Sequence, residues 1–507
     1  MSQSPNSSSA SAQAGTATPD ASSASGGCPF GHGSSDASRL TPIHGPEFTA
    51  DPRPTYEKLR ATGPIAPIEI APGVHGMITT GYRSALHLLR NNPERFAKDP
   101  RNWEALRKGE IPADSPALVM MQPRENALWM DGLEHARLRQ AITDSLELVD
   151  THAVAAATAR IADALIDAFA DRGEADLIGE YAAQLPTAVL IDMFGCPQDT
   201  AQRMVVALGK IFDASADTRQ ANADLEAACL ELTTLKRETP GTDVTSWLIE
   251  HPARLTDAEM IQTILLLIGA GSDPATNLIG NALLLMIADE RFSGDVFTGV
   301  QPVSDALDHV LWTDPPMANY CPLYPRQDMT YEGVPLKAGV PILTSFAMAN
   351  TDPSVQPGGV ARAGNNAHLA FSAGVHGCPA PSLARLMCEI AIERLLDRLP
   401  DITLARPADQ LSRRPGTFVS GWESLPVTFP PVTAAATPAV APSAQPTGDD
   451  VWTTRTSPPP APTPSAPPAA PSTSTPPAAT STPSPTASAP RARRRWWSFL
   501  VRSRRGR

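Results

Sequence analysis

The feature that most restricts the fold of this chain is one long apolar segment, residues 256–288. It begins with Thr256-Asp257-Ala258-Glu259, a capping box in which hydroxyl and carboxylate satisfy the first free N–H groups of a helix. A helix of about thirty residues crosses most of a globular domain. Gly271 and Pro274 interrupt it, because proline removes one N–H and clashes with the carbonyl four residues earlier. The interruption indicates either a kinked core helix or a functional break.

Helical periodicity also dominates the sequence outside this segment. Apolar residues recur at three- and four-residue steps in segments 134–147, 152–171, 221–236, 301–312 and 381–398. Segments 65–70 and 74–80 flank Ala-Pro-Gly, which predicts a β-hairpin, and short pieces near 329–343 and 403–405 add β structure. We therefore expect a mainly α domain with a small β region.

Composition divides the chain into four parts. Residues 1–38 are rich in Ser, Ala and Gly, and residues 433–490 in Pro, Ala, Ser and Thr, so both are predicted to be disordered. Residues 39–432 form the globular domain, and 491–507 form a basic end with eight arginines and no acid. Without that end, 33 bases face 53 acids. An acidic domain argues against nucleic-acid binding.

The basic end encloses Trp496, Trp497 and Phe499 between arginines. Tryptophan favours lipid headgroups, and each cation near an anionic membrane gains about 1 kcal/mol. This predicts a surface anchor for an anionic membrane or a partner; the alternative is a disordered basic tail without a partner. The chain shows neither a signal-peptide pattern nor a membrane-spanning apolar run. We therefore expect a cytoplasmic protein that is peripheral at the inner face of the membrane.

The strongest chemical signal is a glycine-punctuated loop ending at Cys378, just before Pro381 opens a helix. The helix dipole and free backbone N–H groups stabilise a thiolate at such a position, which suits a metal ligand. A buried structural cysteine is the alternative. A zinc site built from His368, His376, Cys378 and Cys388 is disfavoured, because structural zinc ligands come in closely spaced pairs.

Phe371, Gly374, His376, Cys378 and Ala380 fit the pattern Phe-x-x-Gly-x-His-x-Cys-x-Gly/Ala, and through it the chain resembles the cytochrome P-450 superfamily. The resemblance extends over about residues 41–430. It implies the family's mainly helical prism, with haem b (iron protoporphyrin IX) between the 256–288 helix and the cysteine loop. It also implies that Cys378 is the axial thiolate ligand and that Phe371, Gly374 and His376 lie at the cofactor.

Two further segments carry the resemblance. Residues 129–139 are similar to the helix whose His-x-x-x-Arg pair holds a haem propionate, and His135 and Arg139 lie four residues apart, on one helical face. Ala270 and Gly271 resemble the oxygen-binding groove of the distal helix, where small residues let the helix approach the iron. Asp273 is then implied to lie on the proton path.

The chain departs from the family at two places. Its Glu-x-x-Arg motif is replaced by His309 to Trp312, so an apolar aromatic fills the space of a lost buried ion pair. In this the chain resembles an actinobacterial subgroup that lacks the motif. Pro274 stands where the family usually has threonine after the acid, which leaves Ser272 or Thr276 as candidate substitutes.

A lesser departure concerns the strand that follows. Tyr324 occupies the place of a propionate-binding arginine, and Arg326 is the nearest candidate to replace it.

The resemblance implies a haem-thiolate monooxygenase that inserts one atom of O2 into a small lipophilic substrate. A separate ferredoxin and ferredoxin reductase would supply the electrons, because the chain shows no flavin or iron–sulfur domain. The changed groove and the unusual tail motivate an alternative: a catalytically impaired haem-binding protein with a sensing or scaffold role, tethered to a membrane.

Overall fold

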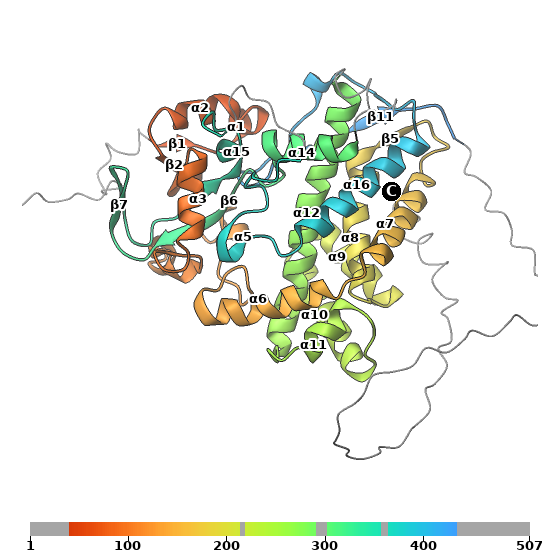
Figure 1. The fold of residues 1–507 in the computed structure, drawn as a ribbon, viewed down its shortest axis with the longest axis horizontal. Coiled ribbons are helices and arrows are strands. Elements are labelled where there is room, and N and C mark those ends of the chain that lie inside the picture. Colours follow the sequence, from red (N-terminus) through yellow and green to blue (C-terminus); the bar gives the residue numbers. More distant parts are fainter. Residues whose placement is uncertain (1–39, 213–217, 290–301, 356–363, 433–507) are drawn as a thin grey trace, which may run out of the picture.

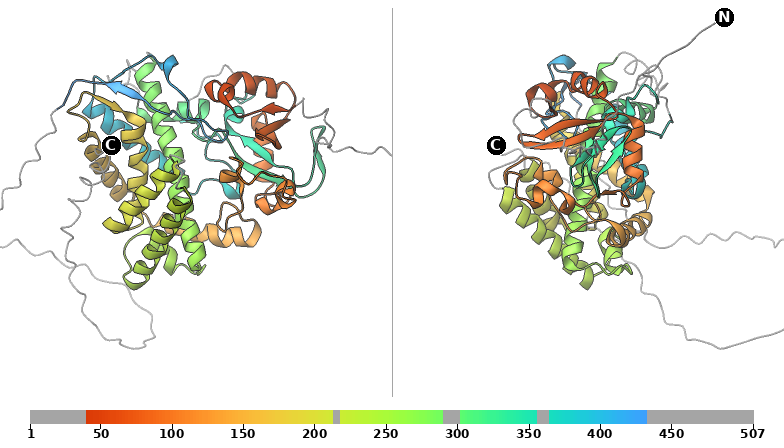
Figure 2. Two further views of the ribbon diagram at one scale, coloured as in Figure 1. Left: turned by 180° about the vertical axis from the view of Figure 1, so that it is seen from behind. Right: turned by 90° about the vertical axis from the view of Figure 1, so that its left-hand side faces the viewer.

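The computed structural model describes residues 40–212, 218–289, 302–355 and 364–432. Two parts lie side by side, one built on a β-sheet with short helices and one built of long helices (Figures 1 and 2). The predictions made for 1–38, 433–490 and 491–507 fall outside the described residues.

The long apolar segment is one helix, α12 (Asp257–Ala288). The predicted capping box is confirmed: Thr256 Oγ1 accepts from the N–H of Glu259, and the Glu259 carboxylate accepts from the N–H of Thr256 at 2.9 Å. Pro274 lies inside this helix and does not end it. Packing on both sides of the proline therefore outweighs the backbone hydrogen bond that the proline removes.

The two halves of α12 belong to different hydrophobic cores. Met260, Ile264 and Ile268 pack with residues of α6, α9, α10 and α11, whereas the stretch from Ala275 to Met286 packs with α7, α8, α14 and α16. Residues 269–274 belong to neither core. These helices span Gly132–Glu147 (α6), Thr151–Ile166 (α7), Gln184–Met193 (α8), Gln198–Phe212 (α9), Thr218–Glu238 (α10), Val244–Glu250 (α11), Val303–Thr313 (α14) and Pro381–Arg398 (α16).

The predicted helices therefore form, and most differ from expectation only at their ends. The segment 152–171 is the exception, because α7 ends at Ile166 and the chain continues in tight turns. There the N–H groups of Ala168 and Phe169 donate three residues back, to Leu165 and Ile166. The mainly helical fold class is confirmed.

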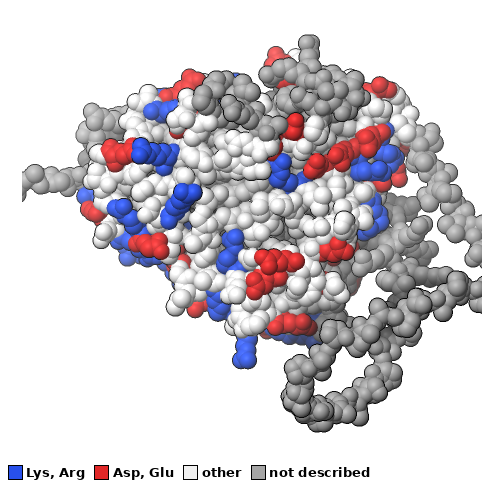
Figure 3. Space-filling view, in the orientation of Figure 1, with Lys and Arg blue, Asp and Glu red and all other residues white. Residues whose placement is uncertain are grey.

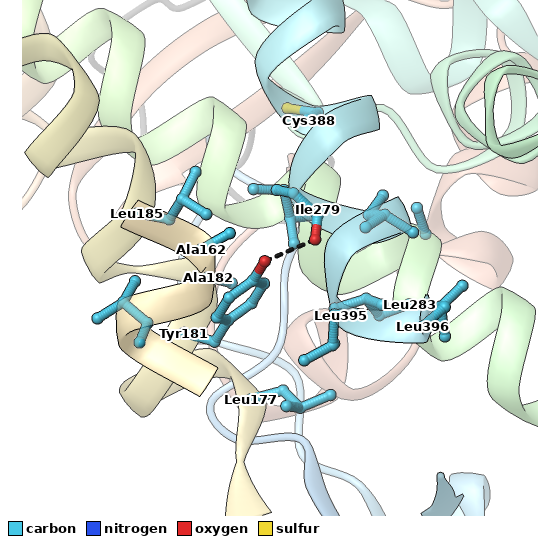
Figure 4. Packing of buried hydrophobic residues seen from close by; sticks show 14 of the residues in the cluster. Ala162, Leu177, Tyr181, Ala182, Leu185, Ile279, Leu283, Cys388, Leu395 and Leu396 are labelled. Atoms are coloured by element: carbon cyan, nitrogen blue, oxygen red, sulfur yellow. Dashed lines mark hydrogen bonds between the residues drawn. The ribbon is translucent and has the colours of Figure 1, made fainter. Parts of the chain in front are cut away.

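Buried contacts join α16 to its neighbours within the larger core. The fully buried Tyr181, in a π-helical turn (Ile178–Ala182), donates its hydroxyl to the carbonyl of Ala391 at 2.6 Å (Figure 4). Cys388 of the same helix lies beside α12, with its sulfur 4.0 Å from the carbonyl oxygen of Ala275. These contacts fix the helix that follows the cysteine loop against the long helix.

A sheet in the order β1-β2-β3-β9-β6-β4 forms the third core. The predicted hairpin is confirmed, with β2 and β3 antiparallel and Gly73 at a φ of +72° in their turn. The remaining strands and short helices are β1 (Thr41–Pro42), β2 (Ile65–Ala71), β3 (Val74–Thr79), β4 (Phe96–Ala97), β5 (Glu174–Asp176), β6 (Asn319–Pro325), β7 (Met329–Tyr331), β8 (Val334–Leu336), β9 (Ile342–Ser345), β10 (Thr403–Leu404), β11 (Pro426–Thr428), α1 (Pro46–Ala50), α2 (Arg53–Arg60), α3 (Tyr82–Arg90), α4 (Glu104–Arg107), α5 (Leu118–Met121) and α15 (Phe346–Asn350).

The surface has two features that bear on function. Acidic and basic side chains are interspersed on the face shown in Figure 3, without a large field of one sign. Two bulky apolar side chains are exposed on α6 and in the cysteine loop, namely Leu133 (89%) and Val375 (45%). No helix in the described ranges is long and apolar enough to reach across a lipid bilayer.

Candidate functional site

The Cys378 loop is a tight turn between buried segments. The N–H of Cys378 donates to the carbonyl of Phe371 at 2.9 Å, and the N–H of Gly377 donates to Gly374 at 3.0 Å. Gly374 begins a 3-10 turn (Gly374–His376) with a φ of +72°, and a Cβ there would lie 2.3 Å from the carbonyl oxygen of Leu89. Glycine is therefore required at 374 for both conformation and space.

Cys378 is exposed as a residue, while the surrounding protein atoms partly desolvate its thiol. Burial raises its pKa, while the N–H of Ala380, 3.4 Å from the sulfur, and the nearby Arg139 lower it. Desolvation is the largest of these effects on the pKa and acts against the single N–H donor. A bound metal cation would supply the missing stabilisation.

Three side chains from α6 and the loop gather next to this cysteine. The rings of His135 and His376 lie 4.0 Å apart, and the Nε2 atom of each is buried without a hydrogen-bond partner in the described part of the chain. Burial lowers the pKa of His135, and burial together with His135 lowers that of His376 to about 2. Arg139 donates to the Val375 carbonyl at 3.3 Å and to Thr143 at 3.2 Å.

Lys98 completes this group, and sequence reasoning missed it. The side chain is fully buried, with Nζ 4.3 Å from the ring centroid of Trp129 and 5.2 Å from that of Tyr320. Its charge lowers the pKa of His376, as do those of His135 and Arg139. No local pattern marks a buried lysine after a two-residue strand. We call Lys98, His135, Arg139 and His376 the donor rim.

An acid beside the donor rim has its carboxylate oxygens already engaged. Asp131, the residue before α6, accepts from the backbone N–H of Lys98 at 2.9 Å and from the guanidinium of Arg326 at 3.2 Å. Arg326 also donates to the carbonyl of Pro93 at 2.5 Å. Asp131 thus joins β4, α6 and the end of β6, and the role predicted for Arg326 at a cofactor stays a prediction.

The donor rim fits a group with two carboxylates. Buried nitrogens without partners among the described residues, here Nε2 of His135 and of His376, are costly, and clustered positive charge attracts anions. Haem is such a group, and Cys378 next to the rim offers a ligand for its iron. Tyr324, where the sequence lacks an arginine, instead places its ring against Trp103, with its hydroxyl buried and burial raising its pKa.

The small residues of α12 divide between two faces of the helix. Ala270 is exposed and a Cβ on Gly269 would meet no atom within 4 Å, so this face borders open space. A Cβ on Gly271 would lie 2.7 Å from Leu190 of α8, so its small size serves helix packing. Pro274 has no N–H to donate to the carbonyl of Ala270, which leaves that oxygen without its usual helical bond.

The predicted proton donors lie in different surroundings. Ser272 is buried, with its hydroxyl unpartnered among the described residues, and Thr276 donates either to the carbonyl of Ala182 at 3.1 Å or to that of Ser272 at 3.0 Å. Asp273 is partly exposed and forms an ion pair with Arg414. The structure therefore brings Asp273 next to Ala270 along the helix, while Thr276 faces Ala182. All three roles stay predictions.

The position of the missing Glu-x-x-Arg motif is well packed. Trp312 is 1% exposed, and its Nε1–H donates to the carbonyl of Asn365 at 2.8 Å. Its ring meets that of His368 edge to face at 5.8 Å. The zinc alternative is excluded, because His368 lies in this cluster and the described residues contain no group of metal-binding side chains.

Comparison with known proteins places the chain among bacterial oxygenases. No family model matches it. It is 31% identical over 392 residues to the 2-hydroxy-5-methyl-1-naphthoate 7-hydroxylase of Streptomyces carzinostaticus, covering 75% of this chain and 95% of the relative. It is 32% identical over 371 residues to the steroid C26-monooxygenase of Mycolicibacterium smegmatis, covering 69% and 87%. The solved structure of CYP154C4 from Streptomyces sp. W2061 is 28% identical, with a TM-score of 0.69 over 76% of this chain and 97% of that one.

Proposed function

The chain belongs to the cytochrome P450 superfamily as a haem-thiolate monooxygenase, and we propose that Cys378 is the axial ligand of haem b and that the donor rim binds its two carboxylates. One observation carries this assignment. Two buried imidazole nitrogens without partners, on His135 and His376, lie next to a cysteine that solvent can reach. A buried donor without a partner costs free energy unless a ligand completes it.

The residues of the chain prepare the site for this chemistry. Bound haem supplies the dioxygen chemistry, and a thiolate ligand favours O–O cleavage. Asp273 is partly exposed, and Arg414 holds its carboxylate in place, an arrangement that suits the proton-path role proposed for it. The carbonyl of Ala270, freed by Pro274, can accept a hydrogen bond from a water or a substrate hydroxyl. In this scheme, that hydroxyl takes the place of the threonine hydroxyl that the helix lacks.

We assign a small lipophilic molecule as the substrate. The relatives named above act on a naphthoate and a steroid, both of which carry large apolar rings. The small residues of α12 leave open space on one face only, next to Ala270. A substrate that combines an apolar body with one hydroxyl would fill that space and bind the free carbonyl.

The reduced, CO-bound absorption spectrum tests the ligand assignment. Wild-type protein is expected to show the red-shifted Soret band of thiolate ligation, and Cys378→Ser is expected to lose it. Cys388→Ser is the matched control, because that sulfur is fully buried against α12 and the substitution should leave the band in place. A wild-type spectrum without the band contradicts the assignment.

Turnover requires electrons, which we assign to a separate ferredoxin and its reductase. Leu133, two residues before His135 on α6, and Val375, in the cysteine loop, are exposed apolar side chains and offer contact surface for a small redox protein. Product formation well above peroxide release, measured with surrogate redox partners, excludes the catalytically impaired alternative. NADPH consumption that is fully accounted for by peroxide release would support the catalytically impaired alternative.

We also keep the anchor assignment for residues 491–507, which rests on sequence alone. Deletion of 491–507 should abolish binding to anionic phosphatidylserine vesicles and leave the CO spectrum unchanged. Retained binding would contradict the anchor. Neutral phosphatidylcholine vesicles provide the control, since arginine gains little from an uncharged surface.

A further inference from the structure

A buried ion pair lies where α14 meets α16, outside the donor rim. Asp308 of α14 is 4% exposed and Arg385 of α16 is 22% exposed, with Oδ1 and Nη1 2.5 Å apart. The contact is an ion pair, and neither of these two atoms has a hydrogen-bond partner among the described residues. The other carboxylate oxygen of Asp308 accepts from the N–H of Gly364 at 2.7 Å. One carboxylate thus binds two segments that are far apart in sequence.

Trp312 lies one helical turn after Asp308 and binds the same segment. Its Nε1–H donates to the carbonyl of Asn365, the residue after Gly364. Asn350 of α15 adds a third connection, because its side chain accepts from the N–H of Leu369 at 2.7 Å and donates to the carbonyl of Leu311 at 2.9 Å. We call Asp308, Trp312, Gly364, Asn365 and Arg385 the α14 junction.

The α14 junction holds the chain on both sides of the cysteine. Gly364 and Asn365 precede Cys378, and Arg385 follows it on the first turns of α16. Between them, the carbonyl of Phe371 accepts from the N–H of Cys378. Fixing both ends of a short loop reduces the conformations open to its middle. The sulfur position is thereby tied to α14.

We propose that Asp308 is a positioning residue for the Cys378 loop. It acts through Arg385 after the loop and through Gly364 before it. Trp312 adds a second contact from α14 to the segment before the loop, through Asn365. Asp308 lies one residue before His309, which stands where the family usually has its acid. The His368 ring beside Trp312 contributes no competing charge, since burial lowers its pKa to about 4. The pair therefore remains the charged centre of this cluster.

The first test is hydrogen exchange of the haem-free protein, so it does not depend on the proposed function. Asp308→Asn keeps an acceptor for Gly364 but leaves the Arg385 charge uncompensated. Exchange in peptides covering residues 364–378 should accelerate by about ten- to a hundredfold. Adding Arg385→Met removes the uncompensated charge and should restore much of the protection. Unchanged exchange in 364–378 would overturn the proposal.

A second ion pair on α16 provides the matched control. Arg394 binds Asp163 of α7 through both carboxylate oxygens, at 2.7 and 2.8 Å. Both side chains are about one-third exposed, unlike Asp308. The two variants are therefore compared by which peptides exchange faster, not by the size of the acceleration. Asp163→Asn should affect α7 and the second half of α16 only. Equal acceleration in 364–378 from this control would also overturn the proposal.

The second readout is the CO-bound spectrum of the loaded variants, which rests on the proposed function. Asp308→Asn should lower the share of protein with the thiolate-type band, whereas Asp163→Asn should not. If Asp308→Asn does not fold, Trp312→Phe removes only the bond to Asn365 and should loosen 364–378 to a smaller degree. If the wild-type spectrum lacks the band, the proposed function is contradicted. The positioning role of Asp308 is then still decided by hydrogen exchange.

Discussion

The donor rim and the α14 junction both contact the part of the chain that carries Cys378, and they differ in whether their buried polar groups have partners. In the rim, the Nε2 atoms of His135 and His376 are buried without a partner among the described residues, and Arg139 lies on the same helix as His135. In the junction, Asp308 and Arg385 balance each other. Buried imidazole nitrogens without partners indicate a place for a ligand, whereas a paired acid and base belong to the scaffold that holds it.

The largest loss of stability is expected for Asp308→Ala. Removing the acid leaves the charge of Arg385 without a partner in a largely buried place, so the free energy of unfolding should fall by about 3 kcal/mol. Urea denaturation of the haem-free protein measures the change. A loss below about 0.5 kcal/mol would show that the pair is not balanced in the way described.

The second prediction concerns pH and His368, beside the junction. Burial lowers its pKa from the usual 6.5 to about 4, so the unfolded chain takes up the proton first as the pH falls. Its contribution to stability is complete above pH 6.5 and is lost as the pH drops towards 4, by up to about 1.4 kcal/mol per pH unit. His368→Gln should flatten the pH dependence of unfolding in that window. An unchanged slope would contradict the lowered pKa.

In the donor rim, a substitution is expected to raise the stability of the haem-free protein rather than lower it. His135→Leu removes a buried nitrogen without a partner, so the haem-free protein should become more stable by about 1 kcal/mol. Its affinity for haem should nevertheless fall by about tenfold, because one donor to the carboxylates is lost. Titration of the haem-free protein with haem and with haem dimethyl ester measures the two affinities. The substitution should not change the affinity for the dimethyl ester, which has no free carboxylates. A loss of stability in the haem-free protein would mean that His135 is a scaffold residue.

The smallest effect is expected for Asp163→Asn, the control pair on α16. Both partners are about one-third exposed, so water screens the interaction and the loss should be about 0.5 kcal/mol. Thermal unfolding of both variants gives the comparison. A loss as large as that of Asp308→Ala would remove the distinction between a buried pair and a partly exposed one.

Local patterns predicted the parts of this structure that are decided within a few turns of chain. The capping box at Thr256 and Glu259 formed as expected, and so did the hairpin around Gly73. His135 and Arg139 lie on one helix beside the loop of Cys378, as their spacing and the family resemblance implied. Gly374 proved necessary because of a backbone contact with Leu89, which the sequence did not indicate.

Pairs that join distant segments were not predictable in the same way. The contacts of Asp308 with Arg385 and of Asp273 with Arg414 link residues 77 and 141 positions apart. No local pattern selects one arginine among many as the partner. Lys98 is a further case, since nothing in its neighbourhood marks a buried ammonium beside two aromatic rings.

The fold class and the long helix could be predicted from the sequence, because capping and periodicity act over short stretches of chain. The role of the cysteine loop was implied by the family resemblance and stays a prediction. Which charged groups pair around that loop depends on tertiary contacts. The tertiary structure turned Gly271 towards Leu190, placed Thr276 against Ala182 and brought Asp308 to Arg385. Desolvation and ion pairing depend on the groups that folding brings together, and those groups come from all parts of the chain.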